Sequence, residues 1–174
     1  MPAEVELKFK VTDFGKIREI LRKTGAAVIH EPAHERNLVL DTADRNIGKA
    51  GKLLRIRQYG DEVFLTVKQP VQPGPMKSRI ENELKIDDTF EEAWRMFEKI
   101  GCLPVYEYEK TREIWLCNGS HVCLDSLFFG MFVEIEADSE EKVAATAALL
   151  GFDPAKGLRQ SYSLLENRHK YSNS

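Results

Sequence analysis

The first strand-like segment, Glu4-Val5-Glu6-Leu7-Lys8-Phe9, most constrains what this chain can fold into. Charged residues occupy every second position, and Val, Leu and Phe occupy the positions between them. Side chains two residues apart in a β-strand lie on the same face, so the segment predicts a strand with one charged face and one apolar face. A single strand of this kind is typical of a solvated sheet surface. The same alternation returns along the chain, however, and the repetition needs its own explanation.

Two later segments resemble the first one closely. Residues 81–86 read Glu-Asn-Glu-Leu-Lys-Ile, and residues 134–136 read Glu-Ile-Glu. A helical pattern that ends in glycine follows each of the three segments. We therefore expect duplicated strand-to-helix units within one sheet. They would form a single domain over residues 1–170, with a frayed tail at 171–174.

Periodicity and turn residues place the remaining elements. Helices are predicted at about 13–24, 89–100, 139–150 and 161–169, and capping-box patterns begin two of them, with Asp88 and Glu91 in one and Asp138 and Glu141 in the other. The remaining predicted strands cover 35–41, 53–57, 63–68, 108–116, 121–125 and 131–136, with hairpin turns at Gly60-Asp61 and Asn118-Gly119. Residues 42–51 read as a loop. Residues 70–77 hold three prolines and are predicted to be the most flexible internal loop.

Composition excludes several classes of protein. The 174 residues are 43% hydrophobic and 30% charged, with a net charge of −3, so no general attraction to nucleic acid or to anionic membranes is expected. No apolar run of about 18 residues and no signal-peptide core is present. Cys102, Cys117 and Cys123 lack metal-type spacing and indicate reduced thiols in a cytoplasmic protein. A disulfide between Cys117 and Cys123 is conceivable but less favoured.

The helices need an apolar surface to pack on, and the apolar faces of the strands offer the only extensive one. The helices must then lie outside the sheet, with the charged face opposite them. Eight antiparallel strands can close into a barrel whose interior holds one small ligand. The predicted fold is therefore α+β, a single closed eight-stranded antiparallel barrel with a charged interior and helices packed on the outside.

Such an interior stabilises a fold poorly, because an ionised group loses several kcal/mol of hydration on burial. It suits a water-filled tunnel that holds a polyanion together with divalent cations. Arginine and lysine recognise phosphate oxygens, and hard Mg²⁺ or Mn²⁺ prefers carboxylates. The predicted interior contains the acids Glu4, Glu6, Glu81, Glu83, Asp125, Glu134 and Glu136 and the bases Lys8, Arg55, Arg57, Lys68, Arg79, Lys110 and Arg112.

Taken in order, these motifs resemble the CYTH superfamily of triphosphate tunnel metalloenzymes, which includes class IV adenylyl cyclases and thiamine triphosphatases. The similarity spans about residues 3–166. It implies an Mg²⁺- or Mn²⁺-dependent enzyme in which Glu6, Glu136 and Lys8 take part in catalysis. The resemblance implies phosphate contacts from Lys8, Arg55, Arg57, Lys68, Arg79, Lys110 and Arg112, metal ligands in Glu4, Glu6, Asp125, Glu134 and Glu136, and supporting carboxylates in Glu81 and Glu83.

The segment from Gly130 to Glu136 and the ending Ser161-Tyr162-Ser163-Leu164-Leu165 look most like the class IV cyclase branch, which converts ATP to cyclic AMP and pyrophosphate. The second strand departs from that branch, because Asn37, Leu38 and Val39 stand where an acid and aromatics are usual. The alternatives are hydrolysis of thiamine triphosphate, tripolyphosphate or a nucleoside triphosphate, and non-catalytic binding of polyphosphate or nucleotide. The expected partner is a small-molecule triphosphate rather than nucleic acid or membrane, and the expected assembly is a monomer or homodimer.

Overall fold

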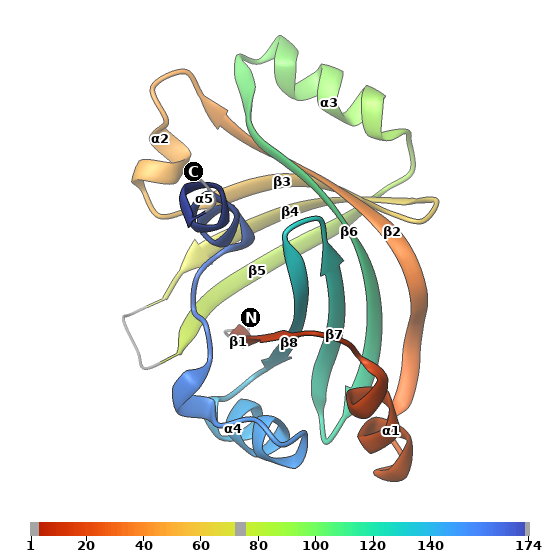
Figure 1. The fold of residues 1–174 in the computed structure, drawn as a ribbon. Coiled ribbons are helices and arrows are strands. Elements are labelled where there is room, and N and C mark those ends of the chain that lie inside the picture. Colours follow the sequence, from red (N-terminus) through yellow and green to blue (C-terminus); the bar gives the residue numbers. More distant parts are fainter. Residues whose placement is uncertain (1–3, 72–75, 173–174) are drawn as a thin grey trace.

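The computed structural model describes residues 4–71 and 76–172, and in this part of the chain eight strands close into one antiparallel barrel (Figure 1). The order around the barrel is β1-β5-β4-β3-β2-β6-β7-β8. The predicted fold is confirmed. The strands are β1 (Glu4–Val11), β2 (Ala27–Thr42), β3 (Leu53–Tyr59), β4 (Glu62–Pro70), β5 (Lys77–Ile86), β6 (Cys102–Cys117), β7 (Ser120–Leu127) and β8 (Gly130–Ala137).

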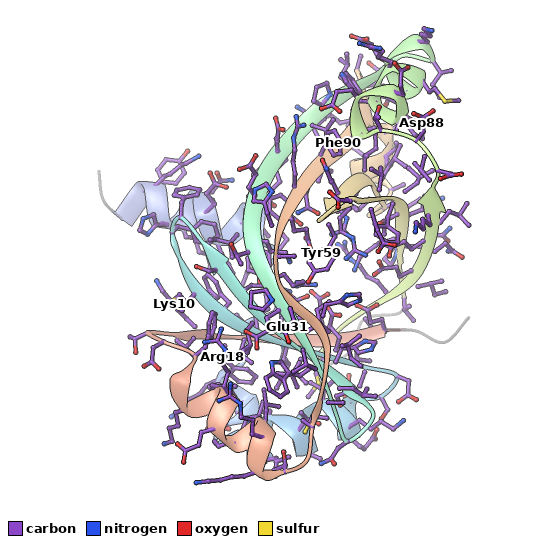
Figure 2. All side chains as sticks on the ribbon, turned by 90° about the vertical axis from the view of Figure 1, so that its right-hand side faces the viewer. Lys10, Arg18, Glu31, Tyr59, Asp88 and Phe90 are labelled. Carbon is purple, nitrogen blue, oxygen red and sulfur yellow. The ribbon has the colours of Figure 1, made fainter. Side chains whose placement is uncertain are left out.

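The helices are α1 (Gly15–Lys23), α2 (Asn46–Lys49), α3 (Phe90–Lys99), α4 (Glu140–Leu149) and α5 (Tyr162–Ser172), with a 3-10 turn, η1, at Pro154–Lys156. The apolar faces of the strands point outward and pack under the helices, as the alternation predicts. One core joins Leu7 and Ile135 of the barrel to Leu21 of α1 and Val143 of α4, all nearly fully buried. A second core lies under α3, and a smaller third one gathers Leu127, Phe129 and Phe132 around Tyr162 at the start of α5. In Figure 2, Arg18 of α1 and Phe90 of α3 lie at opposite ends of the molecule.

The three acid-x-acid strands are neighbours in the closed sheet, in the order β8-β1-β5. Glu6 lies opposite Glu136, and Lys8 lies opposite Glu134, across the β1–β8 pair. Glu4 lies opposite Arg79 across the β1–β5 pair. The repeat seen in the sequence therefore becomes one continuous acidic wall of the barrel.

The predicted lengths of several elements are wrong. Strand β2 begins at Ala27 and β6 at Cys102, so both strands are longer than predicted, and they pair along most of their length with three register shifts. Pro32 and the polar residues around it hide the first half of β2 from a search for alternation. The predicted loop at 42–51 contains α2, because the Asp41 carboxylate accepts hydrogen bonds from the backbone of Ile47 and Gly48.

Both predicted capping boxes are misplaced by one residue. The side chain of Thr89, not Asp88, caps α3 by accepting a hydrogen bond from the backbone N–H of Glu92. Ser139, not Asp138, caps α4 through Lys142. In each pair the more C-terminal residue takes the extended backbone conformation that a cap requires.

Other local predictions have mixed outcomes. The Asn118-Gly119 turn is confirmed, since both residues have positive φ (51° and 73°), as a tight hairpin needs. The three cysteines are free and buried, so no disulfide joins Cys117 to Cys123. Helix α5 reaches Ser172, past the predicted start of fraying, while residues 173–174 lie outside the described residues. Most of the predicted flexible loop, 72–75, also lies outside them. Among the described residues, no helix is both long and apolar enough to cross a membrane.

The cap assignment predicts a difference between two neighbouring substitutions at the start of α4. Ser139→Ala should lower the free energy of unfolding by about 1 kcal/mol, because a backbone N–H of the first turn loses its partner. Asp138→Ala should lower it by less than about 0.5 kcal/mol, because it would lose an exposed ion pair with Lys142 rather than a cap. Urea denaturation of the two variants tests this, and a larger loss for Asp138→Ala would restore the cap predicted from the sequence.

Candidate active site

A cavity of about 290 Å³ lies inside the barrel, and its walls carry the charged faces of the strands. Every charged residue predicted for the interior lines this cavity except Asp125, which is fully buried beside it. The inward direction of the charged faces is therefore correct. The charges are also segregated, because the acids of β8, β1 and β5 form one wall and most of the bases come from β4, β3 and β6.

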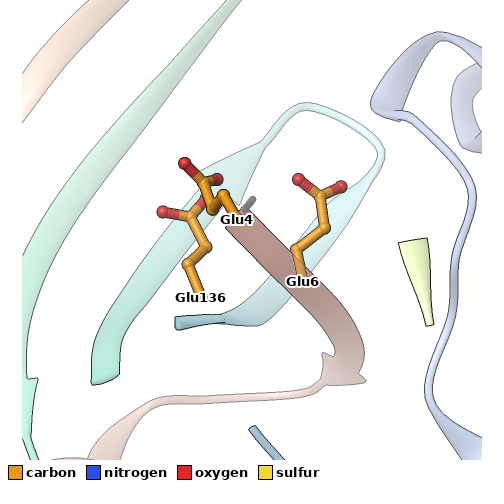
Figure 3. A group of neighbouring side chains, drawn as sticks. All are labelled: Glu4, Glu6 and Glu136. Carbon is orange, nitrogen blue, oxygen red and sulfur yellow. The ribbon is translucent and has the colours of Figure 1, made fainter. Parts of the chain in front are cut away.

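The acidic wall brings three carboxylates together. Oxygen atoms of Glu4, Glu6 and Glu136 lie within 4.8 Å of one another (Figure 3). Burial, followed by the charges of nearby acids, raises the pKa of Glu4 to about 7. Burial and the adjacent Glu134 raise the pKa of Glu136 well above its ordinary value. Three converging carboxylates with this excess of negative charge match the oxygen ligands that Mg²⁺ and Mn²⁺ prefer.

Lys8 lies next to this group and is held on two sides. Its Nζ is 2.7 Å from the Glu6 carboxylate and 3.1 Å from that of Glu134. Burial alone would lower the pKa of Lys8, but the charges of Glu134 and Glu6 outweigh it and raise the pKa. Lys8 is therefore a fixed positive charge inside the tunnel and cannot accept a proton near neutral pH.

The bases of β3 and β4 differ in how closely they are paired, since Arg57 lies 2.6 Å from Glu83 whereas Arg55 has only long ion pairs. The Arg55 guanidinium lies 3.8 Å from Glu81 and 3.9 Å from Glu83, and its Nε is buried without a hydrogen-bond partner. Lys68 contacts Glu81 closely and lies 3.7 Å from Glu4. Arg55 lines the cavity and its ion pairs are long, so an anion bound in the cavity could compete for its guanidinium.

At the other side of the cavity, the bases are fully paired. Asp125 accepts two hydrogen bonds of 2.6 Å from Arg112, one of 3.2 Å from Lys110 and one of 2.6 Å from the Tyr162 hydroxyl. Glu35, also fully buried, lies 3.3 Å from Lys110. Asp125 therefore lies outside the group of three carboxylates, and in this structure it orders cations.

Several residues of the site were not predicted from the sequence. Glu35 and Asn37 share the inward parity of β2, so the alternation rule could have identified them. Tyr162 belongs to the cyclase-like ending at residues 161–165, and the resemblance places it near the tunnel mouth, although its helical spacing suits packing equally well. In the structure it projects into the cavity from α5. The described residues that line the cavity or are buried beside it, and that were not predicted for the site, include Glu35, Asn37, Thr66, Tyr108 and Cys123, with His30 and His121 at more exposed positions.

The raised pKa of Glu4 predicts how stability depends on pH. The folded protein holds a proton on Glu4 up to about pH 7, whereas the ordinary value is 4.5. Between these two values the folded state binds more protons than the unfolded state, so the free energy of unfolding should fall as the pH rises. Denaturation of the metal-free protein at pH 5, 6 and 7 measures this slope.

Glu4→Gln is the control for this prediction, because it keeps the shape of the side chain and removes the titration. The variant should show a shallower slope than the wild type over the same pH range. An equal slope in both proteins would mean that other groups cause it and would refute the assignment to Glu4.

Comparisons with known proteins agree with this geometry. The family model of the CYTH domain matches residues 2–162. A protein of Methanocaldococcus jannaschii described as a "Putative adenylate cyclase" is 33% identical over 143 residues, which are 80% of this chain and 81% of that protein.

Two solved structures share the fold. A protein from Vibrio parahaemolyticus, named a "putative adenylate cyclase", has a TM-score of 0.81 and 24% identity, covering 95% of this chain and 98% of that chain. A Hippeastrum protein, named a "putative adenylyl cyclase" with "a dominant triphosphatase activity", has a TM-score of 0.65 and 17% identity, covering 95% of each chain. The family match spans nearly the whole tunnel barrel and includes the strands that line the cavity, so this chain belongs to the CYTH domain family of triphosphate tunnel enzymes.

Proposed function

We propose that this protein is a divalent-metal-dependent enzyme that converts ATP to cyclic AMP and pyrophosphate inside the tunnel. The observation that carries the proposal is the segregation of charge. A group of three carboxylates, Glu4, Glu6 and Glu136, shares one cavity with Lys68 and with Arg55, whose ion pairs are long. A metal–triphosphate complex carries the complementary charges.

Each wall would do a separate task. Glu4, Glu6 and Glu136 would hold Mg²⁺ or Mn²⁺, which when bound supplies charge neutralisation at the phosphates. Arg55, Lys68 and Arg79 would donate hydrogen bonds to phosphate oxygens, and Arg57, Lys110 and Arg112 would add positive charge. Lys8 would stay charged and fix the position of one phosphate rather than transfer a proton. Catalysis in this arrangement depends on positioning and electrostatic stabilisation.

In the cyclase reaction, the ribose 3′-hydroxyl oxygen forms a bond to the α-phosphorus while the bond from that phosphorus to the bridging oxygen breaks. Pyrophosphate leaves, and the hydroxyl proton passes to solvent. The similarity to the archaeal relative named as an adenylate cyclase supports this reaction for the present chain. The tunnel itself would serve any triphosphate.

Triphosphate hydrolysis is the second candidate, and strand β2 favours it. Its inward positions hold Asn37, which is fully buried and donates to Glu35, and Val39. Neither of these side chains offers the large aromatic surface that would stack on a nucleobase. The phosphate-binding part of the tunnel does not depend on these two positions.

Product analysis tests the proposal directly. The protein should be incubated with Mg²⁺ or Mn²⁺ and, separately, with ATP, thiamine triphosphate and tripolyphosphate. Formation of cyclic AMP with pyrophosphate supports the cyclase reaction, and orthophosphate release supports the hydrolase. Binding without turnover of any of the three would contradict both and leave a non-catalytic binder.

The division of tasks predicts that two substitutions fail differently. Glu136→Gln should lower metal-dependent turnover at least about 100-fold, since even indirect partners of a metal ligand are worth up to about that factor. Its metal-free binding of tripolyphosphate should be retained. Arg55→Gln should weaken that binding about tenfold, because a hydrogen bond to a charged group is worth about 1.5 kcal/mol or more.

Calorimetric titration with tripolyphosphate, with and without Mn²⁺, separates the two effects. Arg36→Gln is the matched control, because Arg36 pairs with Glu91 and Glu107 on the outer side of the barrel. It should bind as the wild type does. If Glu136→Gln and Arg55→Gln instead lose binding and metal dependence equally, the two walls do not have separate tasks.

A further inference from the structure

Tyr162 occupies an unusual position for the first residue of a helix, because its side chain enters a charged cavity and is only 6% exposed. Its hydroxyl donates a hydrogen bond of 2.6 Å to Oδ2 of Asp125. That oxygen also accepts from Arg112 at 2.6 Å and from Lys110 at 3.2 Å. Tyr162 is thus the neutral donor in a buried cluster whose other donors are cations.

The ring of Tyr162 has a second contact with the same set of charges. The Nζ atoms of Lys8 and Lys110 lie 5.3 Å and 5.2 Å from its centroid. A cation within about 6 Å of an aromatic face is attracted by the ring without being neutralised. One side chain therefore contacts Lys8 and Lys110 directly and reaches Arg112 through Asp125.

Lys110 is balanced between two carboxylates, at 3.2 Å from Asp125 and 3.3 Å from Glu35. The hydrogen bond from Tyr162 to Asp125 weakens the attraction between Asp125 and the ammonium group of Lys110. Burial, and then the charge of Asp125, raises the pKa of Tyr162 well above its ordinary value, so the hydroxyl keeps the proton that it donates. Without that hydroxyl, Asp125 would attract Lys110 more strongly and leave it less available to a ligand in the cavity.

The segment that carries Tyr162 is tied to the barrel on both sides. Before α5, the backbone of Leu158 exchanges two hydrogen bonds with that of Lys8 in β1, at 2.8 Å and 3.0 Å. This approach needs Gly157, because a Cβ there would lie 2.9 Å from the Leu7 side chain. After Tyr162, the Tyr106 hydroxyl of β6 donates to Glu166 of α5 at 2.5 Å. The hydroxyl of Tyr162 is therefore held in a defined place relative to β1 and β6.

We propose that Tyr162 is a positioning residue for the triphosphate reaction. Through Asp125 and through its ring, it sets the places of Lys8, Lys110 and Arg112 so that they can meet the phosphates. This inference rests on the proposed function, since it assumes that these cations bind a triphosphate. It adds a contribution from the C-terminal helix to a site that is otherwise built from strands.

The experiment compares Tyr162→Phe, Tyr162→Leu and Tyr106→Phe with the wild type. Tyr162→Phe keeps the buried ring and loses only the hydroxyl, and Tyr106→Phe removes a hydroxyl that anchors the same helix without touching Asp125. The measurements are the affinity for metal-free tripolyphosphate by calorimetry, and KM and kcat with the substrate that the wild type turns over. Thermal melting shows that each variant is folded.

Tyr162→Phe should weaken tripolyphosphate binding and raise KM about tenfold, with a smaller change in kcat, because one hydrogen bond to a buried charge is lost. Tyr162→Leu should weaken binding further, because the lysines also lose the ring. Tyr106→Phe should bind as the wild type does. The phenylalanine variant keeps the shape of the core, so the test does not depend on whether the leucine variant folds.

Two results would overturn the proposal. Unchanged binding and KM in Tyr162→Phe would show that the hydroxyl does not position the cations. An equal loss in Tyr162→Phe and Tyr106→Phe would show that α5 acts only as a cover of the tunnel. A wild-type protein that does not bind tripolyphosphate would refute the proposed function and this inference together, and the wild-type titration alone reveals that case.

Discussion

The mutual neutralisation of ionised side chains inside the barrel is the interaction on which this structure depends. Each buried charge costs several kcal/mol of lost hydration, and pairing in a low-dielectric interior recovers that cost only with good geometry. The pairing is complete around Asp125, where Arg112, Lys110 and Tyr162 saturate one carboxylate. It is incomplete at Glu4 and Glu136, where burial and the charges of neighbouring acids outweigh the more distant Lys68 and Arg112 and raise both pKa values. The charges are thus balanced around Asp125, whereas the acids Glu4 and Glu136 at the other side of the tunnel could be neutralised by a bound cation.

Strand order explains how this imbalance arises. The three acid-x-acid segments are distant in sequence, yet closure of the barrel makes β8, β1 and β5 neighbours. The Arg-x-Arg and Lys-x-Arg segments come together on the remaining wall, in β3 and β6. If acidic and basic strands alternated around the barrel, each charge would have a partner in the next strand and no group would be left for a ligand. The segregation of like charges on separate walls is therefore explained by the binding of a ligand and not by the stability of the barrel.

The barrel and its inward charges were predictable because apolar and charged residues alternate along the strands. The apolar positions form the outer cores, and the charged positions between them line the cavity. The alternation over residues 4–9 predicts a strand with two different faces, and an open sheet would leave the charged face of every such strand to solvent. The tasks of individual residues were less predictable. Nothing in the local sequence around Asp125 shows that Arg112 faces it, since that contact depends on the β6–β7 register. The place of Tyr162 in the cavity could not be distinguished from packing, because helical spacing fits both. The caps at Thr89 and Ser139 depend on a backbone conformation that Asp88 and Asp138 could also have adopted.

The central claim is that the acidic wall holds a divalent cation while the basic wall holds the phosphates. Crystals grown with Mn²⁺ and tripolyphosphate test it most directly, because anomalous scattering locates manganese independently of any model of the ligand. We expect a manganese peak among Glu4, Glu6 and Glu136, with phosphate oxygens between that peak and Arg55 and Lys68. Manganese bound elsewhere, or tripolyphosphate bound outside the tunnel while Glu4 and Glu136 remain without a cation, would contradict it.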